Sequence, residues 1–183
     1  YRAQPGQTGT LHTRLRVGPQ ARINWLPQET ILYDGAALAR RLEVDLDAEA
    51  EFLMVEPVLF GRRAMGEDVH DLRFDDRIVI RRGGAPLFRD GARLWGDVAH
   101  QLDRPAIAGG ARAMASVIAV LPAAPAQLAP LRALIGARGG VSLIGDDLLA
   151  IRLLDVDGYA LRSLLLPILD RLSDNTLPQA WRL

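Results

Sequence analysis

Residues 72–81 read LRFDDRIVIR, and this stretch sets the expectation for the fold. Apolar residues occupy every second position except one, where Asp76 stands, and charged residues fill most of the positions between them. Successive side chains of a strand point to opposite faces, so the alternation predicts a strand with one buried and one solvated face. The same period of two governs the chain from residue 10 to about residue 100.

Three further runs extend this pattern upstream, at 10–17, 42–46 and 52–60. The last run, FLMVEPVLF, is apolar in both phases, which is typical of a strand buried on both sides. Turn signals are expected between the strands, at Asp34-Gly35, Gly83-Gly84 and Asp90-Gly91. Six or so strands with regular turns predict an antiparallel or solenoid-like β structure.

The pattern changes after residue 100. Residues 111–121 predict one buried strand, and 141–144 and 148–154 predict two more. Leucines with helical spacing predict one helix over 128–135 and another over 161–172. Pro167 would break a long helix here, but it lies near the first turn and costs little if Ser163 is the N-cap. That helix packs on the sheet of its own chain or offers its apolar side to a partner.

Composition excludes several classes of protein. The 183 residues suffice for one ordinary domain, and the absence of cysteine removes disulfide scaffolds, thiolate metal sites and cysteine nucleophiles. Basic and acidic residues number 22 each, which argues against a dedicated binder of nucleic acid or anionic membranes. Every basic residue is arginine, so Schiff-base and P-loop lysine chemistry are excluded.

No signal peptide or membrane span is expected from the sequence. The most apolar stretch, 113–126, is too short for a bilayer and is interrupted by two prolines. The four serines lie in no nucleophile motif, and the three histidines are scattered without metal-ligand spacing. The residues therefore predict neither a catalytic site nor a tight metal site.

Acidic residues in apolar surroundings are the unusual feature. Glu56 interrupts the most hydrophobic strand, Asp76 falls in an apolar phase, and Glu29 lies among apolar residues. A buried carboxylate is costly unless it is paired or hydrogen-bonded. One interpretation pairs each acid with an arginine such as Arg40, Arg62 or Arg77, or lets it cap backbone N–H groups. The other places the acids along a wet cavity or a partner surface.

Two blocks carry a resemblance to a known family. LPQETILYDGA at 26–36 is followed by RLEV at 41–44, and the second block is Glu56-Pro57 with FGR at 60–62 and AMGE at 64–67. Together they resemble the urease accessory protein UreD family, also called UreH, and the resemblance runs through nearly all 183 residues. The residues taken as the family motif are Pro27, Gln28, Glu29, Thr30, Asp34, Gly35, Glu56, Pro57, Gly61, Arg62, Met65, Gly66 and Glu67.

This resemblance implies a fold that is mainly β (α+β), a β-helix-like or layered β body with about two helices in the C-terminal half. It is expected to form one unit over residues 1–183, β-rich over 8–121 and mixed α/β over 122–183. Family members carry a further β-rich portion upstream of a segment that Tyr1-Arg2 resembles, so this chain is expected to lack its N-terminal portion. The strand edge left by that portion is expected to lower solubility.

The resemblance also implies a role that is not enzymatic. Proteins similar to UreD join the helical protein UreF and the GTPase UreG in a cytoplasmic complex that docks on urease apoprotein and assists nickel insertion. A hetero-oligomer is therefore expected, with no nucleic acid, no membrane and no stably bound cofactor. Nickel passes in transit, and weak oxygen ligands suit that better than thiolates or clustered imidazoles. On this basis the acids Glu29, Asp34, Glu56, Glu67 and Asp76 become candidates for a transient nickel path.

Two other functions stay open at this point. Glu56 and Glu67 would be the acid–base pair of a small hydrolase or isomerase, although no supporting histidine or oxyanion motif accompanies them. A β carbohydrate-binding module would show exposed aromatics along one strand face, but the three tryptophans are spread apart. Arg62 is expected to clamp a nearby carboxylate, with Glu56 as the candidate whose removal would leave a buried arginine unpaired.

Overall fold

The fold is mainly β, as predicted, with 47% of residues in strands and 23% in helices. The structure is a computed structural model that describes residues 6–182, so the Tyr1-Arg2 segment lies outside the described residues. Contacts group the chain into two compact units, which interleave in sequence. Unit 1 holds residues up to Ala21 with Ile31–Ala50 and Phe60–Gly110, and unit 2 holds Arg22–Thr30, Glu51–Leu59 and Ala111–Leu183.

A four-stranded sheet forms unit 1, in the order β1-β4-β6-β7. Strands β1 (Gly9–Val17), β4 (Ala36–Leu46) and β6 (Leu72–Arg82) pair in parallel, and β7 (Ala85–Gly96) pairs antiparallel to β6. Alternate residues of β4 and β6 are buried, as the period of two predicts. The one short α-helix described in this unit, α1 (Val98–Asp103), was not predicted and begins where the Asp97 carboxylate accepts the His100 N–H at 3.0 Å.

The second sheet follows the order β2-β5-β8-β10-β9, with β3 (Thr30–Leu32) paired to β5 beside this path. Strands β2 (Arg22–Trp25) and β5 (Glu51–Phe60) are parallel. The remaining pairs, formed with β8 (Ala113–Val120), β10 (Leu148–Asp155) and β9 (Gly139–Ile144), are antiparallel. Strand β5 is buried on both faces, as predicted for its apolar run.

The connectivity of the first six strands is β-helix-like. The chain enters the first sheet with β1, the second with β2, and then alternates through β4, β5 and β6. Strands of successive turns therefore pair in parallel, because each returns to its sheet in the same direction. This confirms the solenoid-like character expected from the sequence, while the later strands of both sheets add antiparallel pairs.

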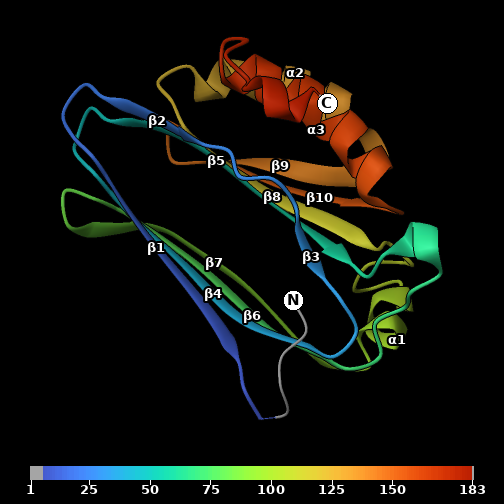
Figure 1. Cartoon of the computed structure of the whole chain (residues 1–183). Helices are drawn as coiled ribbons and strands as arrows, with labels where there is room; N and C mark the ends of the chain where they lie inside the picture. Colours follow the sequence, from blue (N-terminus) through green and yellow to red (C-terminus); the bar gives the residue numbers. More distant parts are fainter. Residues whose placement is uncertain (1–5, 183) are drawn as a thin grey trace. The chain divides into compact units, whose positions relative to one another are not determined.

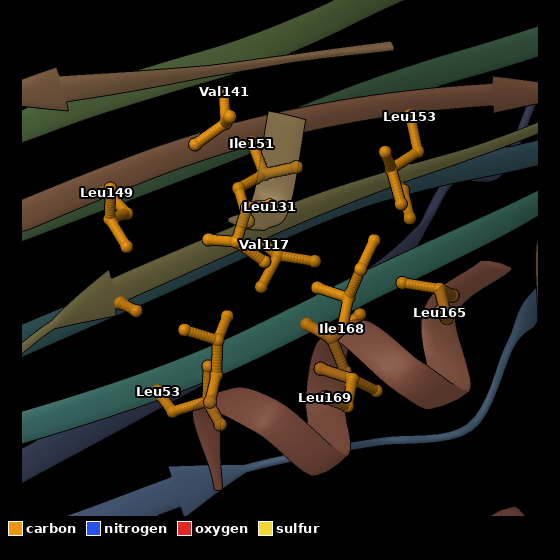
Figure 2. Close-up of a cluster of buried hydrophobic side chains, with 14 of the residues drawn as sticks. Leu53, Val117, Leu131, Val141, Leu149, Ile151, Leu153, Leu165, Ile168 and Leu169 are labelled. Carbon is orange, nitrogen blue, oxygen red and sulfur yellow. The ribbon is translucent and has the colours of Figure 1, made fainter. Parts of the chain in front are cut away.

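Two helices cover one face of the second sheet, α2 (Ala124–Ile135) and α3 (Gly158–Leu172) (Figure 1). Figure 2 shows the core between them, where side chains of β5, β8 and β10 meet those of the helices. Leu165, Ile168 and Leu169 of α3 are fully buried in this core. Helix α3 thus packs on the sheet of its own unit, the first of the two alternatives.

Ser163 is not the N-cap of α3. Its N-cap is Asp157, whose carboxylate accepts the Ala160 N–H at 2.8 Å, while the Ser163 hydroxyl donates to the Tyr159 carbonyl inside the helix. A carboxylate caps the helix N-terminus strongly because it also meets the positive end of the helix dipole. Pro167 therefore lies in the helix interior, where the missing N–H is offset by the buried leucines on both sides of it.

The predicted turn at Asp90-Gly91 was also wrong, because β7 continues through both residues. A Cβ at Gly91 would lie 2.9 Å from the Asp76 carbonyl oxygen, so the glycine here serves a close approach between strands. No helix among residues 6–182 is both long and apolar enough to cross a membrane.

Candidate functional site

The Asp34 carboxylate organises one end of the first sheet. It follows β3, and its Oδ1 accepts the backbone N–H groups of His70 at 2.7 Å and Asp71 at 2.8 Å. Gly35 has a φ of +76° and donates its N–H to the Asp71 carbonyl at 2.7 Å. The Asp34-Gly35 pair therefore joins the β3–β4 turn to the segment that leads into β6, as expected for an acid that caps backbone groups.

A second carboxylate, Glu67, holds the segment that follows β5. Its Oε2 accepts the Arg62 Nε–H at 2.9 Å and the Arg62 backbone N–H at 3.0 Å, and Oε1 accepts from Nη2 at 3.4 Å. The same guanidinium lies over the Tyr33 ring, 4.9 Å from its centroid. Between the two residues, Gly66 takes a left-handed conformation and Met65 is 73% exposed. Arg62 is thus the predicted clamp, but its partner is Glu67, five residues later in the chain, and its side chain is half exposed.

Gly61 makes this loop possible, and its replacement has a large expected cost. Its φ is +76°, and a Cβ there would lie 2.6 Å from the Glu67 carbonyl oxygen. We expect Gly61→Ala to lower the free energy of unfolding by about 2–3 kcal/mol, because backbone strain and a steric clash add. Gly66→Ala is the matched control, since φ is +72° but the space around it is open. Equal urea midpoints for the two variants would refute the steric part of this prediction.

The pKa of the Glu67 carboxyl lies below its ordinary value of 4.5 because the Arg62 side chain donates to it; the backbone N–H groups of Arg62 and Asp34 lower it further, against a smaller effect of burial. A lowered folded-state pKa means that the ionised form stabilises the fold above about pH 4.5. That stabilisation is lost as the pH falls through the folded-state pKa.

We therefore expect Arg62→Ala to raise the Glu67 pKa toward its ordinary value. Carboxyl chemical shifts followed by NMR across an acid titration measure this directly. The conservative variant Arg62→Lys keeps the charge but not the paired N–H geometry and should give an intermediate pKa. An unchanged pKa in Arg62→Ala would show that another group sets it.

In unit 2, Glu29 is fixed by an arginine that sequence reasoning missed. Arg162 of α3 donates from Nε to Oε1 at 2.9 Å and from Nη2 to Oε2 at 2.7 Å, and Nη2 also reaches Gln28 Oε1 at 2.8 Å. Its guanidinium lies over the buried Trp181 ring, whose Nε1 donates to the Leu26 carbonyl at 3.0 Å. Burial raises the pKa of the Glu29 carboxyl, but the hydrogen bonds and charge of Arg162 together with a backbone hydrogen bond outweigh it, so the pKa is lowered.

Glu56 lies in the middle of β5 and is 6% exposed. Trp25 Nε1 donates to its Oε1 at 3.4 Å, and Ser116 of β8 stands opposite in register. The expectation that Glu56 pairs with Arg62 was wrong, because Glu67 takes the Arg62 guanidinium. Pro57 follows it in the strand opposite Ala115. Pro27 and Thr30 flank Glu29 just before and within β3, respectively.

Asp76 forms a deeply buried ion pair. Arg40 of β4 stands directly opposite it in register and donates from Nε to Oδ1 at 3.0 Å and from Nη2 to Oδ2 at 2.7 Å. Both residues are 6% exposed, and the guanidinium lies 5.7 Å from the Phe74 ring centroid. The interpretation that pairs the buried acids with arginines therefore holds for Asp76, and its partner is Arg40.

The five candidate acids are not gathered into one cluster within either unit. Asp34 and Glu67 lie near each other at one end of the first sheet, Asp76 lies within β6, and Glu29 and Glu56 belong to unit 2. Among the described residues no group of three or more histidines and carboxylates could hold a metal ion. The sequence did not point to three residues that contact the motif, namely Arg162, Trp181 and Tyr33. Arg162 and Trp181 lie far along the chain from the residues that they contact, and no local pattern marks Tyr33 as the ring beside Arg62.

Comparison with known proteins identifies a single family. The model of the UreD urease accessory protein family matches residues 1–182. A urease accessory protein UreD of Roseobacter denitrificans is 60% identical over 183 residues, covering 100% of this chain and 67% of the relative. The UreD of Ruegeria pomeroyi is 51% identical over 181 residues, with 99% and 70% covered. That of Rhizobium leguminosarum bv. viciae is 45% identical over 185 residues, with 100% and 67% covered. The chain thus spans about two thirds of the length of these relatives.

Proposed function

The chain belongs to the UreD family of urease accessory proteins, and we propose that it is a scaffold which, with UreF and the GTPase UreG, docks on urease apoprotein and assists nickel transfer to its active site. Family membership itself supports a role in urease maturation. The proposal rests on that single observation, and the contacts of the motif carboxylates add support to it. Its setting would be a cytoplasmic hetero-oligomer without nucleic acid or membrane.

The motif carboxylates support a scaffold better than an acid–base enzyme. Glu67 and Glu29 are held by bidentate arginines, and the pKa of each is lowered. A general acid near neutral pH needs the opposite shift, a raised pKa. Glu56 belongs to unit 2 and Glu67 to unit 1. A carbohydrate-binding module would show several exposed aromatics along one strand face, whereas Trp181 is buried in unit 2 and Trp95 is the one exposed tryptophan of the three, all of which lie among the described residues.

Nickel enters this proposal as cargo and not as a resident cofactor. We retain Glu29, Asp34, Glu56, Glu67 and Asp76 as proposed contacts along its path. A carboxylate that already pairs with an arginine or accepts backbone N–H groups binds a cation weakly, and weak oxygen ligands allow rapid release. Carboxylates of this kind suit a protein that passes nickel on and do not suit a protein that stores nickel.

Co-purification tests the proposed complex. The affinity-tagged chain, co-expressed with UreF and UreG, should retain both proteins through size-exclusion chromatography, and urease apoprotein should join when added. Absence of UreF from the tagged fraction, with the chain itself folded by circular dichroism, would overturn the scaffold proposal.

The path is tested residue by residue. Each of the five acids is changed to its amide, and the nickel content of urease purified from the cells is measured by mass spectrometry. The matched control is Glu49→Gln, an exposed carboxylate that accepts from Gln20 at 3.3 Å. Lower nickel with an intact accessory complex supports a residue, and unchanged nickel removes it from the path.

A further inference from the structure

One face of the first sheet carries a strong excess of arginine. It is formed by the outward-pointing positions of β1, β4, β6 and β7, which alternate with the buried row. We call it the arginine face, and in the described part of the chain its charged residues are Arg14, Arg16, Arg41, Glu43, Asp45, Arg73, Asp75, Arg77, Arg81, Arg89 and Arg93. Eight arginines and three carboxylates leave a net charge of +5 on this face, although the whole chain is neutral.

Glu43 is shared by four basic groups. Its carboxylate contacts His12 at 2.6 Å, Arg41 at 2.6 Å, Arg14 at 3.3 Å and Arg81 at 3.9 Å. The hydrogen bond to His12, with those from the arginines, lowers the pKa of Glu43 to about 2. Each guanidinium carries five N–H donors, so most of their donor capacity stays directed at solvent.

Asp75 is shared in the same way. Arg77 donates to its Oδ1 at 2.9 Å and Arg93 to its Oδ2 at 2.9 Å. Both arginine side chains are more than half exposed. The carboxylates of the face therefore hold the arginine side chains in place, and the face keeps its net positive charge.

One row across the sheet brings basic side chains next to one another. His12, Arg41 and Arg77 stand side by side in register on β1, β4 and β6. Arg41 and Arg77 lie directly opposite each other, where like charges destabilise a sheet, and Glu43 and Asp75 offset only part of the positive charge of the face. A pocket of about 240 Å³ lies here, lined by this row with the short side chains Thr10 and Ala39 and with Asp75.

An exposed aromatic side chain lies further along the same face, opposite Arg73. Trp95 of β7 is 63% exposed, and the Arg73 guanidinium lies 5.6 Å from its ring centroid. Both line a neighbouring pocket of about 380 Å³ that shares Ala39 and Asp75 with the first. Exposed tryptophan next to arginine is the composition of interface hot spots, where both residue types are enriched.

We propose that the arginine face is a docking surface for an acidic segment of a partner protein, whose carboxylates pair with Arg41 and Arg77. Arginine and carboxylate form short, charge-assisted hydrogen bonds in paired geometry. A nucleic acid fits less well, because Glu43, Asp45 and Asp75 would meet a continuous phosphate backbone. The proposal rests on the geometry of this face and does not depend on the function proposed above.

A fluorescent peptide of twelve glutamates is the probe, and its anisotropy is measured with the full chain at low salt. Exchanging the central pair, Arg41→Gln with Arg77→Gln, should weaken binding at least about tenfold. The matched control removes the same charge elsewhere, through Arg104→Gln with Arg132→Gln, both exposed, and should change affinity by less than about twofold.

Three outcomes would overturn the proposal. They are no binding of the peptide, equal weakening in the central and control pairs, and tighter binding of a DNA duplex of equal charge than of the peptide. Circular dichroism of both double variants confirms that the sheet is intact, so a loss of binding is not a loss of fold.

Discussion

Asp76→Ala is expected to lower the free energy of unfolding by about 3–5 kcal/mol, the cost of leaving one partner of a buried ion pair alone. The Arg40 guanidinium is 6% exposed and would lose two hydrogen bonds of 3.0 and 2.7 Å. It points into the apolar phase of the sheet beside the Phe74 ring and cannot readily turn to solvent. Urea unfolding followed by circular dichroism measures the change.

Two variants control this prediction. Asp75→Ala removes the neighbouring carboxylate on the exposed face and should cost less than about 1 kcal/mol. Arg40→Met with Asp76→Leu replaces the pair by apolar groups of similar size and should recover most of the stability lost in Asp76→Ala. The account of this pair fails if Asp76→Ala unfolds at the same urea concentration as Asp75→Ala.

Trp181→Ala is the second large effect, with an expected loss of about 3–5 kcal/mol. The indole is 1% exposed within the core of unit 2, and its Nε1 holds the Leu26 carbonyl at 3.0 Å. Its ring also lies against Arg162, which fixes Glu29. Truncation therefore leaves a cavity and loosens the residues 26–29 at once.

An exposed tryptophan, Trp95, provides the comparison. Trp95→Ala removes a side chain of the same size that is 63% exposed and should cost less than about 1 kcal/mol. Far-UV circular dichroism is the readout, because both changes alter fluorescence. Similar thermal midpoints for the two variants would contradict the buried role of Trp181.

The fold was largely predictable from periodicity. The run at 72–81 has a period of two because one face of β6 is buried and the other is exposed, and this holds also for β4. Parallel pairing could not be read in the same way, because alternation is equal in parallel and antiparallel strands. The cap of α3 was misplaced because Ser163 and Asp157 are both good N-cap residues, and only packing decides between them.

The candidate site was less predictable. The apolar phase around Asp76 predicted a partner for its carboxylate and offered Arg40 as one of three arginines, but only the register of β4 and β6 shows that Arg40 lies opposite it. The Glu29–Arg162 pair joins residues 133 positions apart, and no local pattern points from one to the other. Arg62 was given the wrong carboxylate because Glu56 lies in a hydrophobic run, while its actual partner Glu67 is only five residues away, across a glycine turn.

The nickel content of urease tests the central claim most directly. Urease is produced in cells that lack the gene for this chain and again in cells where that gene is restored, and nickel per purified urease is measured by mass spectrometry at equal nickel supply. A scaffold for nickel transfer predicts nearly nickel-free, inactive urease without the chain and full loading with it. Equal nickel loading in both cells would contradict the account.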